Sequence, residues 1–305
     1  MQTQTERVFL RQDPAGHLFQ YSKLFNPQRL LADENGFVVF DYGGDKAVRF
    51  NWDFRLLNEI SLESGQGPGE MGGITDTEIV ADTLYLADAS NAVIHVYGLD
   101  GNFGHSFSIA DKIPHRIVSI GSEHLFISTP MSPVDGMEGI YSYNGNAEYS
   151  VESITADDVR YRVLLESEFA SNSEFVFRAP QFFGVLIKYD RTGAVVSARK
   201  TIDGFYTTFD DRDTGGSNQP LMFNRSDLEM ATLRIRSAGD AVCTLQIRQV
   251  GDPEGERVTD CYDAETLEYR FSLDTPAGTQ DIGLYDNYFV TVQDTTLTVN
   301  RIHRD

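Results

Sequence analysis

The sequence predicts an all-β chain that folds as a six-bladed β-propeller, with four antiparallel strands in each blade. Its 305 residues include 20 Phe and 14 Tyr, and aromatic and β-branched residues favour strands over helices. A turn built on Asp or Asn also follows an apolar strand at regular intervals, since Asp53, Asp100, Asn144 and Asp190 are 47, 44 and 46 residues apart. A period of about 45 residues, with four short strands in each unit, is typical of propeller blades.

The two ends of the chain predict how the ring closes. The last unit, residues 279–305, has only three recognisable strands. Two short β-rich segments, residues 7–11 and 17–21, precede the first blade and can supply the missing strand. Closure by strands from both ends removes exposed sheet edges, so we expect the N-terminal segments to complete the last blade.

All six blades are expected in a single domain, residues 1–305. We place them at residues 26–62, 73–109, 113–154, 159–202, 230–273 and 279–305, the last completed by residues 7–21. The turns at Asp190 and Asp263 are 73 residues apart because an insertion at residues 203–229 interrupts the pattern. Long loops in compact domains are often functional, so the insertion is a candidate part of a binding site.

The clearest unit of the repeat begins with a glycine-rich corner, GQGPGE at residues 65–70. A phosphate-binding loop needs Gly-Lys-Ser/Thr at the start of a helix, and a dinucleotide-binding fingerprint also needs a following helix. Here Met71, Gly72 and Gly73 lead into a predicted strand. We therefore interpret the corner as a structural turn.

This corner and the unit after it resemble the NHL-type repeats of six-bladed propellers in the TolB-like group, and bacterial cell-envelope propellers in particular. The sequences LYLADASN at residues 84–91 and IHVY at residues 94–97 also match the NHL pattern. The resemblance extends from about residue 26 to the end of the chain. It implies the six-bladed fold and a place in the cell envelope, as for a lipoprotein, but no particular function.

Charge and the N-terminal sequence limit the partners and the location. The chain has 25 Lys and Arg against 46 Asp and Glu, and its net charge of -21 repels nucleic acids and anionic membranes. No apolar run approaches the roughly 18 residues needed to span a bilayer. The start, MQTQTERVFL, is typical of neither a signal nor a transit peptide and looks like a mature N-terminus behind an initiator Met. We therefore expect a periplasmic or cell-surface protein whose signal has been removed.

The two cysteines leave two possibilities open. Cys243 and Cys261 fall in neighbouring predicted strands of one blade. A disulfide is geometrically compatible with this placement, and two buried free thiols are an equal alternative.

The candidate site lies at the rim of the central channel, where each inner strand of a propeller begins. The residues expected at this rim are Arg29, Asp76, His115, Arg116, Arg160, Arg162 and Asp281. The cations among them indicate an anion or carboxylate site, and the alternative is ion pairing with neighbouring Asp and Glu. The loop 178–183 and the insertion add Arg and aromatic side chains that suit sugars or peptides. The candidate ligand-binding residues are His115, Arg116, Arg160, Arg178, Tyr206 and Arg212.

Three functions are compatible with these features. The leading hypothesis is a non-catalytic extracytoplasmic module that binds a small ligand, glycan or peptide at the loop-rich face of the channel, without a cofactor. The alternative is a metal-dependent, lactonase-like hydrolase with Ca²⁺ or another divalent ion in the channel. The third is a scaffold that binds another envelope protein. The sequence contains no G-x-S-x-G elbow and no closely spaced His pair, so we assign no catalytic residue and no metal ligand.

Overall fold

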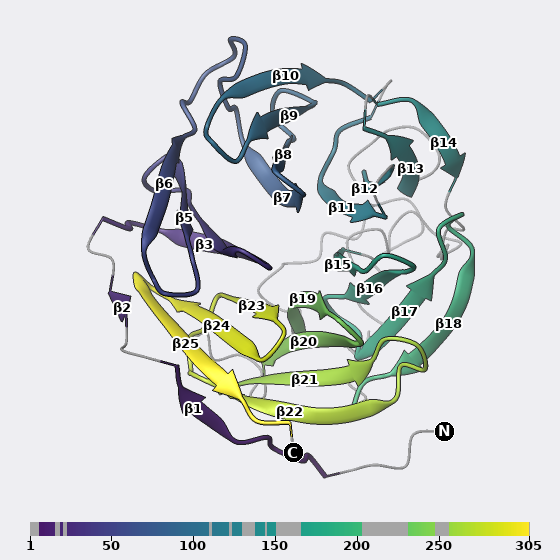
Figure 1. Ribbon diagram of the computed structural model, residues 1–305. Coiled ribbons are helices and arrows are strands. Elements are labelled where there is room, and N and C mark those ends of the chain that lie inside the picture. Colours follow the sequence, from purple (N-terminus) through teal and green to yellow (C-terminus); the bar gives the residue numbers. More distant parts are fainter. Residues whose placement is uncertain are drawn as a thin grey trace, which may run out of the picture.

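A propeller of six sheets is confirmed by the computed structural model (Figure 1), which describes residues 6–15, 19–20, 23–109, 112–121, 124–129, 138–143, 145–150, 166–202, 231–247 and 256–304. Each sheet contains four antiparallel strands that follow one another along the chain, except the sixth, which the N-terminal segment completes. Among the residues so described, no helix is long and apolar enough to cross a membrane.

The first three blades are built from consecutive strands. Blade 1 comprises β3 (Pro27–Asp33), β4 (Gly36–Asp41), β5 (Lys46–Phe50) and β6 (Leu56–Ser61). Blade 2 comprises β7 (Ile74–Val80), β8 (Thr83–Asp88), β9 (Val93–Gly98) and β10 (Phe103–Phe107). Blade 3 comprises β11 (Arg116–Ile120), β12 (His124–Ser128), β13 (Glu138–Ser142) and β14 (Ala147–Ser150).

The other three blades repeat this order. Blade 4 comprises β15 (Ser167–Ser171), β16 (Val176–Pro180), β17 (Val185–Tyr189) and β18 (Val195–Lys200). Blade 5 comprises β19 (Thr232–Ala238), β20 (Ala241–Ile247), β21 (Arg257–Asp263) and β22 (Tyr269–Thr275). Blade 6 contains β23 (Asp281–Tyr285), β24 (Tyr288–Gln293) and β25 (Thr296–Ile302).

The core is divided among the interfaces between neighbouring blades. Successive side chains of a strand point to opposite faces of its sheet. Because a neighbouring blade packs on each face, a middle strand carries apolar side chains at nearly every position. β4 and β8 follow this rule, with every residue of β4 buried and five of the six residues of β8 buried. Buried apolar clusters join blade 1 to blade 2, each later blade to the next, and blade 6 back to blade 1. Each blade is therefore stabilised by both of its neighbours.

The N-terminal segment closes the ring, as predicted, but it does so across two blades. β1 (Gln12–Pro14) and β2 (Phe19–Gln20) both pair with β25, and β1 is the outer strand of blade 6 (Figure 1). The preceding residues, expected to belong to the same blade, instead lie beside blade 5, where Phe9 forms a parallel bridge with Ser272 of β22. The reason is a buried anion, because the carboxylate of Asp260 accepts two hydrogen bonds of 2.9 Å from the guanidinium of Arg7.

The glycine-rich corner is a turn, and a buried aspartate holds the chain beside it. Within the corner the Glu70 carboxylate accepts a 2.8 Å hydrogen bond from the backbone N–H of Gly67. At the end of β8, Asp88 accepts hydrogen bonds from the backbone N–H groups of Gly72 and Gly73. Burial raises the pKa of Asp88, but bonds from His95 and from the backbone outweigh burial and lower it to about 2. The carboxylate is thus kept charged to anchor the crossover into blade 2.

The two cysteines form a disulfide. Cys243 of β20 and Cys261 of β21 are directly opposite each other in the antiparallel register and are covalently joined. Both are fully buried between blades 5 and 6.

The contact between Arg7 and Asp260 gives the first prediction. We expect Arg7→Ala to lower the free energy of unfolding by about 3 kcal/mol, because it leaves the buried Asp260 carboxylate without its cation. Arg11→Ala, which removes the exposed ion pair between Arg11 and Asp13, should change it by less than about 1 kcal/mol. Equal midpoints in urea denaturation for the two variants would contradict the role assigned to Arg7.

Candidate functional site

The first strand of every blade places one ionisable side chain at the central axis, and the six alternate in sign. From blade 1 to blade 6 they are Arg29, Asp76, Arg116, Glu168, Arg234 and Asp281. Each pairs with one of the last residues of the second strand of its blade, so the six positions are structurally equivalent. We call these six residues the axial ring.

Glu168 is the centre of this ring. Its carboxylate is 3.0 Å from Arg29 of the opposite blade, 2.9 Å from Arg116 and 3.3 Å from Arg234. The Gln181 side-chain amide donates a further bond of 3.1 Å. Since the Glu168 residue is only 1% exposed, its charge depends entirely on these partners.

Each of the two aspartates of the ring links its blade to the next through a hydrogen bond from a backbone N–H group. Asp76 accepts a 3.1 Å bond from the backbone N–H of Ile117 in the next blade. Asp281 accepts a 2.9 Å bond from the backbone N–H of Leu30, also in the next blade. In both cases the donor follows the ring arginine of that blade. Asp281 is also 2.5 Å from Arg236, which lies two residues after the ring residue of β19.

Burial and charge act in opposite directions on the ring. Burial raises the pKa of Glu168, but Arg116, Arg29 and Arg234 outweigh burial and hold it far below its ordinary value. Burial lowers the pKa of Arg29, but Asp76 and Glu168 more than compensate and raise it. Burial lowers the pKa of Arg234, and the positive charge of Arg29 acts in the same direction. The negative charge of Glu168 opposes this shift but does not reverse it. Arg234 is also the ring arginine with the longest distance to its nearest carboxylate, 3.3 Å against 2.6 Å for Arg29 and 2.9 Å for Arg116.

A second carboxyl group lies further along the first strand of blade 2. Glu78 accepts a 2.9 Å hydrogen bond from the hydroxyl of Ser119. Burial raises the pKa of Glu78 to about 7, with the Ser119 hydrogen bond lowering it and the negative charge of Asp76 raising it. This group changes charge near neutral pH.

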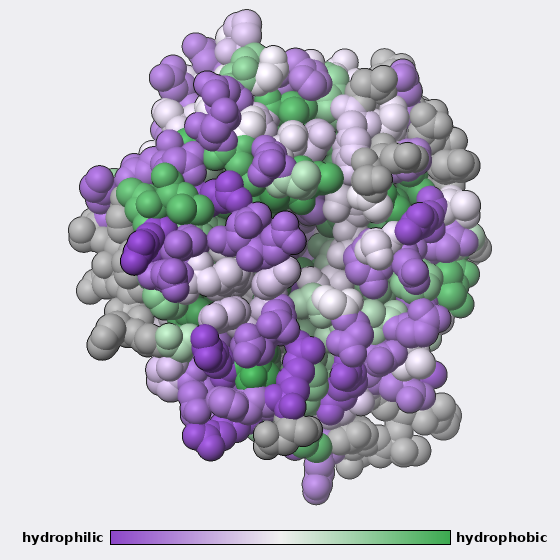
Figure 2. All heavy atoms as spheres, in the orientation of Figure 1, coloured by the Kyte–Doolittle hydropathy of each residue, from purple (hydrophilic) through white to green (hydrophobic). Residues whose placement is uncertain are grey.

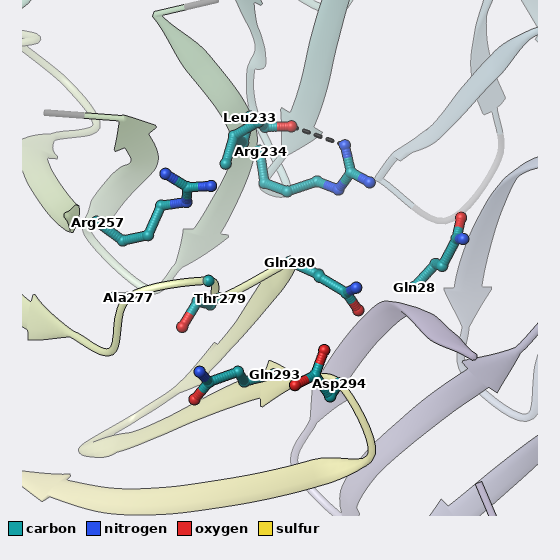
Figure 3. A pocket seen from close by; sticks show the side chains of 10 residues that line it. Gln28, Leu233, Arg234, Arg257, Ala277, Thr279, Gln280, Gln293 and Asp294 are labelled. Atoms are coloured by element: carbon teal, nitrogen blue, oxygen red, sulfur yellow. Dashed lines mark hydrogen bonds between the residues drawn. The ribbon is translucent and has the colours of Figure 1, made fainter. Parts of the chain in front are cut away.

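A pocket of about 610 Å³ opens beside the axial ring. We call it the mouth pocket, and it is lined by Gln28, Leu233, Arg234, Arg257, Ala277, Gly278, Thr279, Gln280, Gln293 and Asp294. In Figure 3 the side chains of Arg234 and Arg257 lie along one side of it, and those of Thr279, Gln293 and Asp294 lie along the other. Arg234 belongs to both the ring and the pocket, and its side chain is 20% exposed.

Polar atoms with unused hydrogen-bonding capacity gather near the ring and the mouth pocket. Among the described side chains, buried polar atoms without a hydrogen-bond partner include Tyr42 Oη, Gln181 Oε1, Thr232 Oγ1 and Gln280 Oε1. Tyr42 is close enough to the ring for Arg29 and Asp76 to act on its pKa, Gln181 bonds to Glu168, and Gln280 lines the pocket. Unpaired buried polar groups are uncommon in native proteins, so their concentration here indicates a place where a polar ligand can bind.

The structure brings two of the predicted ligand-binding residues to the channel. Arg116 is a ring residue and also donates a 2.8 Å bond to the carbonyl oxygen of Thr75. His115 is adjacent and partly buried, and burial together with Arg116 lowers its pKa to about 4, so its imidazole is neutral at pH 7. The described arginines of the ring form ion pairs with Asp and Glu, which was the alternative to an anion or carboxylate site.

Arg178 is placed elsewhere. The expected loop at residues 178–183 includes the end of β16, where Arg178 is 1% exposed. It donates a 2.9 Å bond to Ser167 and lies over the ring of Phe169 at 5.7 Å, so it packs inside blade 4. Phe182, expected to be an exposed aromatic, is fully buried. The remaining predicted residues, Arg160, Arg162, Tyr206 and Arg212, lie outside the described residues.

The sequence prediction did not identify Glu168, Arg234 or Arg257. The first strand of blade 4 begins at Ser167, whereas the sequence placed it near residue 159. The alternation of charge is the signal that could have found Glu168, because Arg29, Asp76 and Arg116 already occupy equivalent positions in blades 1 to 3.

Comparison with known proteins shows the fold alone. No family model and no curated protein matches the chain. A DUF4221 family member from Bacteroides vulgatus is similar in structure, with a TM-score of 0.64, 8% identity, and 98% of this chain and 99% of that chain covered. A candidate exported protein of Bacteroides fragilis has a TM-score of 0.61 and 11% identity, with 100% of this chain and 97% of that chain covered. Streptogramin B lyase has a TM-score of 0.56 and 11% identity, with 97% of this chain and 98% of that chain covered. The similarity to NHL-type repeats stays a prediction.

The axial ring gives the second prediction. We expect Glu168→Gln to lower the free energy of unfolding by about 3–5 kcal/mol, because the buried Arg29 and Arg116 and the partly buried Arg234 lose their shared counter-ion. Glu174→Gln, at an exposed turn of the same blade, serves as the matched control and should have little effect. Urea denaturation at pH 7 measures the difference, and a variant as stable as the control is inconsistent with a structural role for the ring.

Glu78 gives a prediction about pH. The folded state holds a proton on this carboxyl up to about pH 7, whereas an unfolded Glu releases it near its model value of 4.5. The folded state therefore binds more protons in this window, and stability falls as pH rises through it. Glu78→Gln abolishes this loss of stability. The free energy of unfolding of the variant, relative to that of the wild type, should therefore increase from pH 5 to pH 8, by at most about 3 kcal/mol. Thermal unfolding of both proteins at the two pH values measures this change. If the difference in stability between variant and wild type is the same at both pH values, the raised pKa of Glu78 is refuted.

Proposed function

We propose that this chain is a binding module that takes a small polar ligand in the mouth pocket. The observation that carries the proposal is the pocket itself, about 610 Å³ in volume and lined by two arginines and three glutamines. Cavities of roughly 300–1,000 Å³ with a few convergent polar groups are typical ligand sites. The unpaired oxygen of Gln280 adds an acceptor that the protein itself does not use.

The chemistry of the pocket favours binding over catalysis. Arginine stays protonated and amides do not titrate, so among the lining residues named above only the exposed Asp294 is a candidate general acid or base. A divalent ion in the channel would need free carboxylates. Within the described part of the chain, each ring carboxylate is already held by arginine, and no three His, Cys, Asp or Glu side chains converge as metal ligands. The ring therefore does not suit a cation.

A scaffold role has less support. Figure 2 shows a largely hydrophilic face, with an apolar patch over β6, where Leu56 and Leu57 are 45% and 48% exposed. The other large exposed apolar residues among those described fall on different elements: Val8, Phe9, Phe25, Phe103 and Val196. Isolated exposed apolar residues are normal on proteins and do not define an interface.

We also propose that the protein works outside the cytoplasm. The disulfide between Cys243 and Cys261 supports this, because disulfides persist mainly in oxidising compartments. The similarity in fold to a candidate exported protein agrees with this location.

The proposal predicts a pocket-specific loss of binding. A thermal-shift screen of small polar molecules should find compounds that stabilise the wild type, by about 2.7 kcal/mol at a concentration 100 times the Kd. Ala277→Trp, which puts bulk at the pocket wall, should abolish these shifts. Ala194→Trp, at an exposed hairpin of blade 4, should preserve them. Compounds that stabilise both variants equally bind elsewhere, and that result would remove the mouth pocket from the function.

A further inference from the structure

We infer that the mouth pocket is one end of a longer cleft, and that this cleft binds a linear, uncharged oligosaccharide. The inference rests on the proposed function and adds the chemical class and the length of the ligand. Three features of the molecule support it: a second pocket beside the first, a balance of charge along both pockets, and a buried polar oxygen without a partner in each.

A second pocket, of about 300 Å³, adjoins the mouth pocket at Gln28, which lines both. We call it the side pocket. Its other lining residues come from the turn between β4 and β5 (residues 41–46) and from the crossover between blades 1 and 2 (residues 62–74). In Figure 3, Gln28 lies on the side of the mouth pocket away from Arg257. Both volumes fall within the roughly 300–1,000 Å³ of typical ligand sites, so a chain of at least two units has room on either side of Gln28.

The two pockets carry equal numbers of positive and negative side chains. The three cations and three carboxylates that line them are Arg234, Arg257 and Lys46 against Asp41, Asp45 and Asp294. The other residues of the axial ring, together with Arg236, which bonds to Asp281, add three more of each sign. The difference, 6 - 6, leaves no charge for a ligand to neutralise. Because a charge that leaves water without a counter-ion is costly, an uncharged ligand suits the cleft best.

Each pocket also contains a buried polar oxygen with unused hydrogen-bonding capacity. Gln280 Oε1 of the mouth pocket and Tyr42 Oη of the side pocket have no hydrogen-bond partner among the described residues. The Gln280 oxygen only accepts hydrogen bonds, whereas the Tyr42 hydroxyl both donates and accepts. A sugar hydroxyl satisfies either group, because it can donate one bond and accept others. A ligand with hydroxyl groups on successive units would therefore engage both pockets.

The lining of the cleft favours sugar hydroxyls over a peptide. Each pocket has one exposed carboxylate, Asp294 in the mouth pocket and Asp45 in the side pocket, and ionised carboxylates only accept hydrogen bonds. A peptide backbone offers one N–H donor per residue, whereas a sugar unit offers several hydroxyl donors. Leu62 and Met71 of the side pocket are only 2% and 5% exposed, so they offer little apolar surface to a peptide side chain.

The test measures the affinity of the full chain for sugars of increasing length by calorimetry. The probes are glucose and N-acetylglucosamine with the trisaccharides maltotriose, cellotriose and triacetylchitotriose. We expect at least one trisaccharide to bind at least about tenfold more tightly than its single sugar, because its further units bind next to a unit that is already held. Its affinity should be the same at low and high salt, since it carries no charge.

Four results overturn the inference. They are no binding of any probe, equal affinities for each trisaccharide and its single sugar, tighter binding of the anion glucuronate than of glucose, and tighter binding of acetyl-trialanine amide than of every trisaccharide. The first of these leaves the proposed function standing if the thermal-shift screen still finds ligands that Ala277→Trp abolishes.

Variants assign the gain in affinity to the side pocket. Ser64→Trp fills the side pocket at an exposed position, so it should lower trisaccharide affinity to that of the single sugar and leave the single sugar unaffected. Ser173→Trp, in the exposed turn between β15 and β16, is the matched control and should change neither affinity. Circular dichroism and the unfolding temperature check that each variant folds. Equal trisaccharide affinities of Ser64→Trp and Ser173→Trp would exclude the side pocket.

Tyr42→Phe is a milder second variant. It removes only the hydroxyl group, which has no partner among the described residues, so the unfolding temperature should not fall. It should weaken trisaccharide binding by at least about threefold, the loss of one hydrogen bond, and leave single-sugar binding unchanged. Unchanged trisaccharide binding contradicts the role given to Tyr42 Oη.

Ala277→Trp separates this inference from the proposed function. If it abolishes the binding of every sugar while Ser64→Trp changes nothing, the mouth pocket stands and the longer cleft fails. If Ala277→Trp leaves sugar binding unchanged, the proposed function fails as well.

Discussion

The structure depends on the neutralisation of carboxylates that are buried at the axis of the propeller. An unpaired buried carboxylate costs several kcal/mol, so Asp76, Glu168 and Asp281 can be buried only if arginines from other blades reach them. Glu168 of blade 4 bonds to Arg29 of blade 1 across the axis, and the two aspartates accept backbone N–H groups of the next blade. The ring is thus held together at its centre by charge, in addition to the apolar contacts between blades and the strand pairing at its closure.

The same constraint explains why an arginine of the ring reaches the mouth pocket. A ring that alternates in sign uses each of its carboxylates to hold arginines, and the additional Arg236 takes part of the charge of Asp281. Arg234 shares its two carboxylates with closer partners and faces the pocket. The exposure of Arg234 in the pocket is therefore a consequence of how the buried charges are balanced. In the function that we propose, Arg234 serves both stability and recognition, so a change at Arg234 acts on both.

The sequence allowed the fold to be predicted because its signals are local. Asp and Asn turns recur in each of the first five blades, and a last blade one strand short implies N-terminal closure. The site was predictable only in part. Arg116 was found because rim residues begin inner strands, whereas Glu168 was missed because the first strand of blade 4 begins later than its pattern indicated. Arg178 was misplaced because a sequence does not distinguish an arginine at a rim from one that lies over Phe169 inside a blade.

The N-terminal closure also governs the order in which the molecule can be assembled. Residues 7–14 are synthesised before all six blades, yet their partners Asp260, Ser272 and β25 lie in blades 5 and 6. During synthesis, the early segment has no strand to pair with until blades 5 and 6 are made. Until β21 is made, Arg7 lacks its carboxylate, and until β25 is made, β1 lacks the strand that it pairs with. The N-terminal segment therefore docks only after the first four blades have been made.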